Sequence, residues 1–261
     1  MTSNQNLSER PLILLTNDDG FFREEIQILF RRLRDLGRTV IVAPDRERSA
    51  ASLAVTLRQP LRLHAIRPRV WSVDGTPADC VYFALQKILP RKPDLLISGM
   101  NPGPNLGQQD IHYSGTVAAA VQGIFMGIPS VSISLIPGPG GAFDLRFSAS
   151  IVRRLAGAIL AGGLPPGTAL NVNIPHPPVR GVKITKLGWK FYEPEIIEKK
   201  DPRDSAYYWI GTGRPRRVGE EDSDVISAYR GFISVTPLHT DMTAHDVRRS
   251  RRLGTLARLL R

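Results

Sequence analysis

The sequence predicts an α/β protein built on a mostly parallel, doubly wound sheet with helices on both faces. Two observations lead to this prediction. Short apolar runs alternate along the chain with longer segments whose apolar residues recur at helical spacing, an alternation typical of strands joined by crossover helices. Several of the short runs are apolar at nearly every position, as strands covered on both faces of a sheet are.

The first apolar run is followed by two adjacent carboxylates. Residues 12–16 form the run, and Asn17-Asp18-Asp19-Gly20 follows as a turn signal before a helical pattern at 24–36. This order places Asp18 and Asp19 at the carboxyl end of the first strand, the edge at which open α/β sheets bind ligands. Adjacent carboxylates repel each other and a divalent cation relieves the repulsion, although these residues would also suit a plain turn.

The remaining elements continue the alternation. We expect strands at 39–43, 57–65, 70–73, 94–98, 130–135, 170–174, 183–187 and 232–237, with 57–65 and 70–73 forming a hairpin. We expect helices at 24–36, at 77–89, after Ser114 through Met126, at 146–161 and at 245–260. The chain then divides into a three-layer, Rossmann-like core (1–188), an extended arm (189–231), and a last strand with a C-terminal helix (232–261).

Composition limits the class of protein. The 261 residues are 42% hydrophobic and 23% charged, which suffices for a large core. A single cysteine, Cys80, excludes an internal disulfide framework and a multi-cysteine zinc site, so a reducing cytoplasm is expected. The most apolar stretch, 117–137, is interrupted by Gln122 and Pro129 and does not read as a membrane span. The net charge of +11 favours anionic partners without identifying them.

Oxygen-bearing side chains follow several of the predicted strands. Ser49 lies in the polar loop after the second strand, and Asn101 lies in a glycine-rich loop, 99–107, whose backbone can approach a ligand closely. Together with Asp18 and Asp19 they form an oxygen-only donor set, which suits Mg²⁺, Mn²⁺ or Ca²⁺ better than zinc. For Ser49 the alternative is a simple cap on the next segment.

A possible anion site begins the alanine-rich helix. Ser114-Gly115-Thr116 stands at the helix start, where backbone N–H groups and the positive end of the helix dipole attract anions. A plain N-cap would use the same residues. We predict that Ser114, Gly115 and Thr116, with Asn105, bind a substrate phosphate. A metal beside such a cradle suggests phosphate chemistry, in which the cation polarises a phosphoryl oxygen and lowers the pKa of a bound water.

The chain resembles the SurE (survival protein E) family of metal-dependent nucleotidases. The motifs that carry the resemblance are Thr-Asn-Asp-Asp-Gly (16–20), Ala-Pro-Asp-Arg…Ser (43–49), Gly-Thr-Pro-Ala-Asp-Cys (75–80), Ser-Gly-Met-Asn-Pro-Gly-Pro-Asn-Leu-Gly (98–107), Tyr-Ser-Gly-Thr-Val (113–117), Asp-Pro-Arg (201–203), Tyr-Tyr-Trp-Ile-Gly (207–211) and Ser-Val-Thr-Pro-Leu (234–238). They extend over nearly the whole chain in order.

The resemblance implies a fold, a site and an activity. It implies one divalent metal ion per subunit, Mg²⁺ or Mn²⁺ with Ca²⁺ as a substitute in crystals, held by Asp18, Asp19, Ser49 and Asn101. Asp18 and Asp19 would act in catalysis through a metal-activated water. The expected reaction releases phosphate from nucleoside 5′- or 3′-monophosphates, and in some members from short polyphosphate.

Two segments depart from the family pattern. The stretch Gly107-Gln108-Gln109-Asp110-Ile111-His112 is one residue longer than usual and lacks the common paired Asp, and Gln122 stands where a Glu is frequent. Neither change affects the four expected metal ligands. Both could alter loop shape, metal preference or rate.

Two other functions compete with the phosphatase. The arginine clusters would suit a nucleic-acid- or anion-binding protein, but no RNA-binding motif is present and the cationic terminal helix also fits a dimer rim. An interaction protein with an inactive site is the other alternative, and the intact ligand set argues against it. The arm has Tyr207, Tyr208 and Trp209 in succession, which predicts a homodimer or tetramer.

Overall fold

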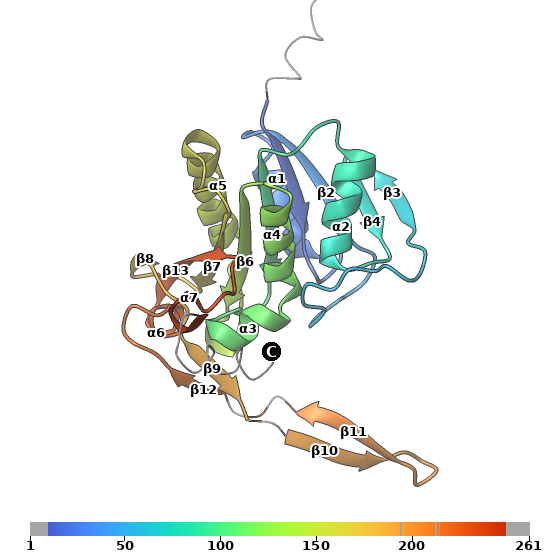
Figure 1. The fold of residues 1–261 in the computed structure, drawn as a ribbon, viewed down its shortest axis with the longest axis vertical. Coiled ribbons are helices and arrows are strands. Elements are labelled where there is room, and N and C mark those ends of the chain that lie inside the picture. Colours follow the sequence, from blue (N-terminus) through green and yellow to red (C-terminus); the bar gives the residue numbers. More distant parts are fainter. Residues whose placement is uncertain (1–9, 194, 212, 214, 249–261) are drawn as a thin grey trace, which may run out of the picture.

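A nine-stranded sheet forms the centre of the molecule (Figure 1). The computed structural model describes residues 10–193, 195–211, 213 and 215–248. The strand order is β3-β4-β2-β1-β5-β6-β7-β13-β8. The bounds are β1 (Leu12–Thr16), β2 (Arg38–Pro44), β3 (Leu63–Arg67), β4 (Val70–Val73), β5 (Leu95–Asn101), β6 (Ser130–Ile136), β7 (Thr168–Pro175), β8 (Gly181–Ile184) and β13 (Phe232–His239).

The sheet is doubly wound around β1. This strand pairs in parallel with β2 on one side and with β5 on the other, and the parallel run continues through β4 in one direction and through β6 and β7 in the other. Only β3 and β13 introduce antiparallel pairings, with β4 and β7. The order reverses between β1 and β5, and such a switch point opens a crevice at the carboxyl ends of the strands. The predicted fold class is confirmed.

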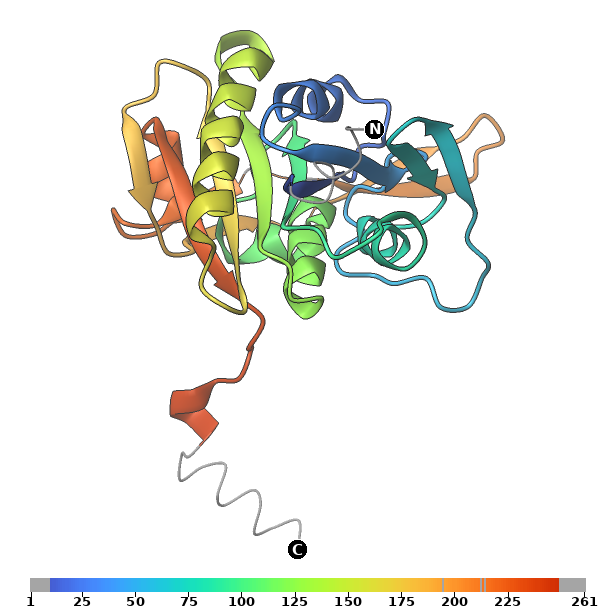
Figure 2. The ribbon, with the colours of Figure 1, turned by 90° about the horizontal axis from the view of Figure 1, so that it is seen from above.

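Helices cover both faces of the sheet, as Figure 2 shows from above. The helices are α1 (Glu24–Arg32), α2 (Pro77–Phe83), which continues as a π-helical turn (Ala84–Ile88), α3 (Gly107–Tyr113), α4 (Gly115–Phe125), α5 (Leu145–Gly162), α6 (Asp224–Tyr229) and α7 (His245–Arg248), with a 3₁₀ turn at Pro139–Gly141. Helices α1 and α5 lie on one face, and α2 and α4 on the other. No helix in the described part of the chain is long and apolar enough to cross a membrane.

The two hydrophobic layers explain why the first four residues of β1 are all apolar. Ile13 and Leu15 pack into the cluster beneath α1 and α5, whereas Leu12 and Leu14 pack into the cluster beneath α2 and α4. Successive side chains of a strand point to opposite faces, so a strand covered on both faces is mostly apolar. Cys80 is buried in the second cluster.

Several elements differ from the sequence prediction. Helix α1 ends at Arg32 rather than Leu36, and β3 begins at Leu63, so most of the strand expected at 57–65 is irregular. Strand β5 runs on to Asn101, through the first part of the expected loop, because Asn101 pairs with Ser134 of β6 after a register shift. Helix α3 was not expected at all. Of the terminal helix expected at 245–260, the part after Arg248 lies outside the described residues.

A projecting ribbon leaves the sheet at its carboxyl edge (Figure 1). Strand β9 (Trp189–Tyr192) pairs with β12 (Pro215–Val218), and β10 (Glu195–Lys200) pairs with β11 (Ala206–Gly211), all antiparallel. The arm expected over 189–231 is shorter than predicted, because α6 returns to the body and buries Val225 and Ala228.

Candidate active site

The turn after β1 is fixed by Asn17. Its amide nitrogen donates to the carbonyl of Gly20 (2.9 Å), and its amide oxygen accepts the backbone N–H of Gly20 (3.2 Å). Gly20 has φ +106°, a conformation that residues with a Cβ rarely adopt. Both ends of one buried side chain therefore hold the Asn-Asp-Asp-Gly turn, and Asp18 and Asp19 lie together at the carboxyl edge of the sheet.

Asp18 is held by the start of α4. Its side chain is only 5% exposed, and its Oδ1 accepts a hydrogen bond from the Thr116 hydroxyl. A Cβ added to Gly115 would lie 2.9 Å from the Asp18 Cβ, so the helix start and the carboxylate are in close contact. Burial raises the pKa of Asp18, while the donors from Thr116 oppose this rise. The positive end of the helix dipole also favours the ionised carboxylate.

Asp19 lacks a partner for one of its oxygens. Its Oδ2 is buried and has no hydrogen-bond donor among the described residues. Burial, and next the neighbouring charge of Asp18, raise the pKa of Asp19 to about 7. An orphan carboxylate oxygen beside a second carboxylate is the arrangement that a bound cation would complete, so these residues fit a divalent metal ion.

The loop after β2 approaches the same pair. The backbone N–H of Arg48 donates to the carbonyl of Asp18 (2.7 Å), and the Ser49 hydroxyl donates to Oε1 of Glu47 (2.7 Å). The charge of Glu47 contributes to the raised pKa values of Asp18 and Asp19. Glu47 is thus a third carboxylate near the site that the sequence analysis did not single out. The sequence feature that could have identified Glu47 is its position in the same loop as Ser49, two residues earlier.

Asn101 lies at the end of β5, the other neighbour of β1. Its amide nitrogen donates to the carbonyl of Gly103 (2.7 Å), which leaves the amide oxygen as the atom suited to a cation. The four expected ligands therefore lie at or just after the carboxyl ends of β1, β2 and β5, three adjacent parallel strands. The described residues contain no group of three or more His, Cys, Asp or Glu that could hold a metal, so a metal here requires the mixed set of carboxylates, hydroxyl and amide.

The residues expected to bind phosphate already have partners within the protein. The Ser114 hydroxyl accepts the backbone N–H of Val117 (3.1 Å) as the N-cap of α4, and the Thr116 hydroxyl is engaged by Asp18. Asn105 is buried, donates to the Ser134 hydroxyl (2.7 Å) and receives donors from Asn171 and Asn173 on its carbonyl. The cradle therefore remains a prediction.

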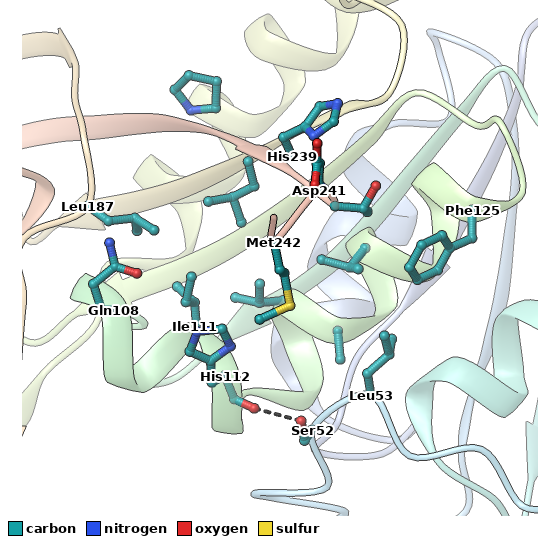
Figure 3. Close-up of a pocket in the computed structure, with 16 residues that line it drawn as sticks. Ser52, Leu53, Gln108, Ile111, His112, Phe125, Leu187, His239, Asp241 and Met242 are labelled. Atoms are coloured by element: carbon teal, nitrogen blue, oxygen red, sulfur yellow. Dashed lines mark hydrogen bonds between the residues drawn. The ribbon is translucent and has the colours of Figure 1, made fainter. Parts of the chain in front are cut away.

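A separate cavity of about 450 Å³ lies along α4 (Figure 3). Its walls come from α3, α4 and the segment after β13, including His112, Phe125, His239 and Met242. None of the eight expected site residues lines it. Ser52, in the loop that contains Ser49, also lines the cavity, and its hydroxyl donates to the carbonyl of His112 (2.6 Å).

The fold, with these side chains at the carboxyl edge of the sheet, defines a doubly wound α/β protein with an oxygen-rich, acidic site at its topological switch point. The profile of the family described as "Survival protein SurE" matches residues 13–194. A protein of Geobacter metallireducens named "5'-nucleotidase SurE" is 45% identical over 234 residues, which cover 88% of this chain and 92% of that protein. The protein of the same name from Vibrio vulnificus is 43% identical over 242 residues, covering 91% and 93%.

A solved structure agrees with the sequence comparisons. The crystal structure of the SurE protein from Aquifex aeolicus matches with a TM-score of 0.81 at 38% identity, and the match covers 94% of this chain and 100% of that chain. The chain belongs to the SurE family. The expected resemblance is confirmed, and membership is consistent with a requirement for a divalent metal ion.

Proposed function

We propose that this protein is a 5′-nucleotidase, a phosphomonoesterase that hydrolyses nucleoside monophosphates to nucleoside and inorganic phosphate with the help of a divalent metal ion. The observation that carries the proposal is the pair Asp18 and Asp19 at the switch point: Asp18 is buried, and the partly buried Asp19 has one orphan oxygen. Relatives named 5'-nucleotidase, 43–45% identical over about nine tenths of the chain, support the same activity.

Four side chains would hold the metal. Asp18 and Asp19 supply carboxylate oxygens, Ser49 a hydroxyl and Asn101 an amide oxygen, a donor set typical of Mg²⁺ or Mn²⁺. One cation per subunit would satisfy the orphan oxygen of Asp19 and offset the repulsion between the carboxylates. When bound, it supplies positive charge to a phosphoryl oxygen.

The other residues of the site orient these ligands and the substrate. Thr116 fixes one oxygen of Asp18, and Asn17 fixes the turn that presents Asp19. The N–H groups at the start of α4, with Ser114, Gly115, Thr116 and Asn105, would orient the phosphate. In the reaction the bond between phosphorus and the nucleoside oxygen breaks, the oxygen of water joins phosphorus, and the leaving oxygen takes a proton. The proposal extends to 3′-nucleotides and short polyphosphate, to a cytoplasmic location, and to a homodimer or tetramer.

A phosphate-release assay tests the proposal. Purified protein is incubated with AMP or GMP in the presence of Mn²⁺, Mg²⁺ or EDTA. We expect turnover with Mn²⁺ or Mg²⁺ and none with EDTA. Each of the variants Asp18→Asn, Asp19→Asn and Asn101→Ala should lower kcat/KM at least 100-fold with an unchanged circular dichroism spectrum. Asp35 is an exposed carboxylate in the turn after α1, so Asp35→Asn should retain wild-type activity.

Other outcomes would favour the competing functions. Absence of turnover with every metal and nucleotide, combined with salt-sensitive binding of RNA, would support a nucleic-acid-binding protein. Absence of both would support an interaction protein without activity. Near-normal activity in Asp18→Asn and Asp19→Asn would contradict the metal assignment.

A further inference from the structure

A buried ion pair connects the base of the arm to α3. Lys190 of β9 is 3% exposed, and its Nζ lies 2.6 Å from Oδ2 of Asp110 in α3. The same oxygen of Asp110 accepts the backbone N–H of Leu106 (3.1 Å), which caps the helix start. Lys190 and Asp110 are 80 residues apart in sequence, so the contact joins two segments that share no local structure.

A second buried carboxylate fixes the same junction. Asp224, at the start of α6, is fully buried and accepts the backbone N–H groups of Gly107 (2.8 Å) and Gly188 (2.8 Å). A Cβ at Gly107 would lie 2.9 Å from the carbonyl oxygen of Gly188, and Gly107 has φ +72°. The first turn of α3 is therefore packed tightly against the strand that begins the arm.

The other end of α3 contacts two segments of the proposed site. Its last residue, Tyr113, accepts the backbone N–H of Ser52 (3.1 Å), and the carbonyl of His112 accepts the Ser52 hydroxyl (2.6 Å). Ser52 belongs to the loop that contains Ser49. Immediately after α3, Ser114 caps α4, whose Thr116 holds Asp18. A helix of seven residues thus lies between the arm and both halves of the site.

We infer that Lys190 and Asp110 are positioning residues for the phosphatase site: their buried contact sets the place of α3, and α3 sets the loop of Ser49 and the start of α4. This inference rests on the proposed function. A buried ion pair adds little to stability compared with apolar residues of the same volume, so stability alone is a weak reason for placing one at this junction. Geometry does explain its place, because α3 is a helix of seven residues that contacts the arm at its start and the site loops at its end.

The test uses a variant that removes both charges of the buried pair together, so that neither is left without its partner. Asp110→Asn with Lys190→Met keeps an acceptor for Leu106 and the apolar stem of Lys190, so the fold should persist. A matched control, Asp35→Asn with Arg153→Met, removes an exposed ion pair between α5 and the turn after α1. Circular dichroism and melting temperature establish that both proteins are folded.

The first readout is hydrogen–deuterium exchange of the metal-free proteins and needs no activity. We expect amides in 45–54 and 106–116 to exchange at least fivefold faster in the Asp110/Lys190 variant than in wild type, with 24–36 unchanged. Unchanged protection of 45–54 would overturn the inference whether or not the protein hydrolyses nucleotides. Faster exchange over the whole chain would also overturn it, since it would show a general loss of stability.

The second readout is a double-mutant cycle on AMP hydrolysis with Mn²⁺. We expect kcat to fall about tenfold in the Asp110/Lys190 variant and in Ser52→Ala, and the combination to lose little more than either alone, because both interrupt the same connection. Losses that multiply would contradict the inference. Inactive wild-type protein would instead contradict the proposed function and leave the exchange experiment as the decisive measurement.

Discussion

Replacing Asp19 with Asn should make the metal-free protein more stable while removing its activity. In the metal-free protein the carboxylate is partly buried, one oxygen lacks a partner, and Asp18 lies beside it. Asn has nearly the same shape without the charge. A residue that lowers the stability of the free protein is expected where a ligand completes the site.

The magnitude follows from the pKa. A pKa of about 7 instead of 3.8 for Asp19 corresponds to roughly 4 kcal/mol at ~1.4 kcal/mol per pKa unit. The side chain remains in partial contact with solvent, and screening reduces the effect, so we expect a gain of about 1–2 kcal/mol for Asp19→Asn at pH 8. That corresponds to about 2–6 °C in melting temperature for a chain of this size.

Because the pKa of Asp19 is raised, the stabilisation by Asp19→Asn should depend on pH. A carboxyl whose pKa is raised on folding favours the folded state below its unfolded pKa, near 3.8, and this contribution is lost as the pH rises through about 7. The gain from Asp19→Asn should therefore be largest at pH 8 and fall to roughly two fifths of that value at pH 5.

Thermal unfolding in EDTA at equal protein concentrations, at pH 5 and pH 8, measures this difference. Asp35→Asn is the control, because Arg153 lowers the pKa of Asp35 and its removal should not stabilise the protein. A variant no more stable than wild type at pH 8, or equally stabilised at both values, would refute the reasoning.

Two further substitutions test the geometry around the pair. Ala50, directly after Ser49, has φ +57°, a strained conformation for a residue with a Cβ, so Ala50→Gly should raise the melting temperature by about 2–4 °C. Ala51 has an ordinary φ, so Ala51→Gly should lower the melting temperature. Equal shifts of the two variants in differential scanning calorimetry would show that the backbone at Ala50 is not strained. A Cβ at Gly115 would lie 2.9 Å from that of Asp18. Gly115→Ala should therefore displace Asp18 and lower kcat for AMP at least 30-fold. In the control Gly162→Ala the new methyl group meets no atom within 4 Å, so kcat should be unchanged. Similar rates in the two variants would show that the activity tolerates displacement of Asp18.

The parts of the fold that depend on local chemistry were predictable from the sequence. Residues 12–15 of β1 are all apolar because two layers cover the strand. Asn17 and Gly20 close their turn through hydrogen bonds between residues three apart. Both features can be recognised from a few consecutive residues of the sequence. The paired carboxylates at the sheet edge followed from the same reasoning.

Helix α3 and its contacts were not predictable in this way. The segment begins with Gly107-Gln108-Gln109-Asp110, which has no apolar periodicity, and Gly107 is fixed by Asp224, 117 residues further on. Asp110 and Lys190 are two of many charged residues until the fold brings them together. The proximity of Glu47 to Asp18 likewise depends on a loop conformation that composition does not encode.

The central claim is that Asp18, Asp19, Ser49 and Asn101 hold one divalent cation. Anomalous diffraction from crystals soaked in Mn²⁺ tests it most directly, since the manganese signal locates the ion without assumptions about the reaction. We predict one strong peak per subunit within about 2.6 Å of carboxylate oxygens of Asp18 and Asp19 and near Asn101. A peak only at other residues, with this edge of the sheet empty at saturating Mn²⁺, would contradict the account.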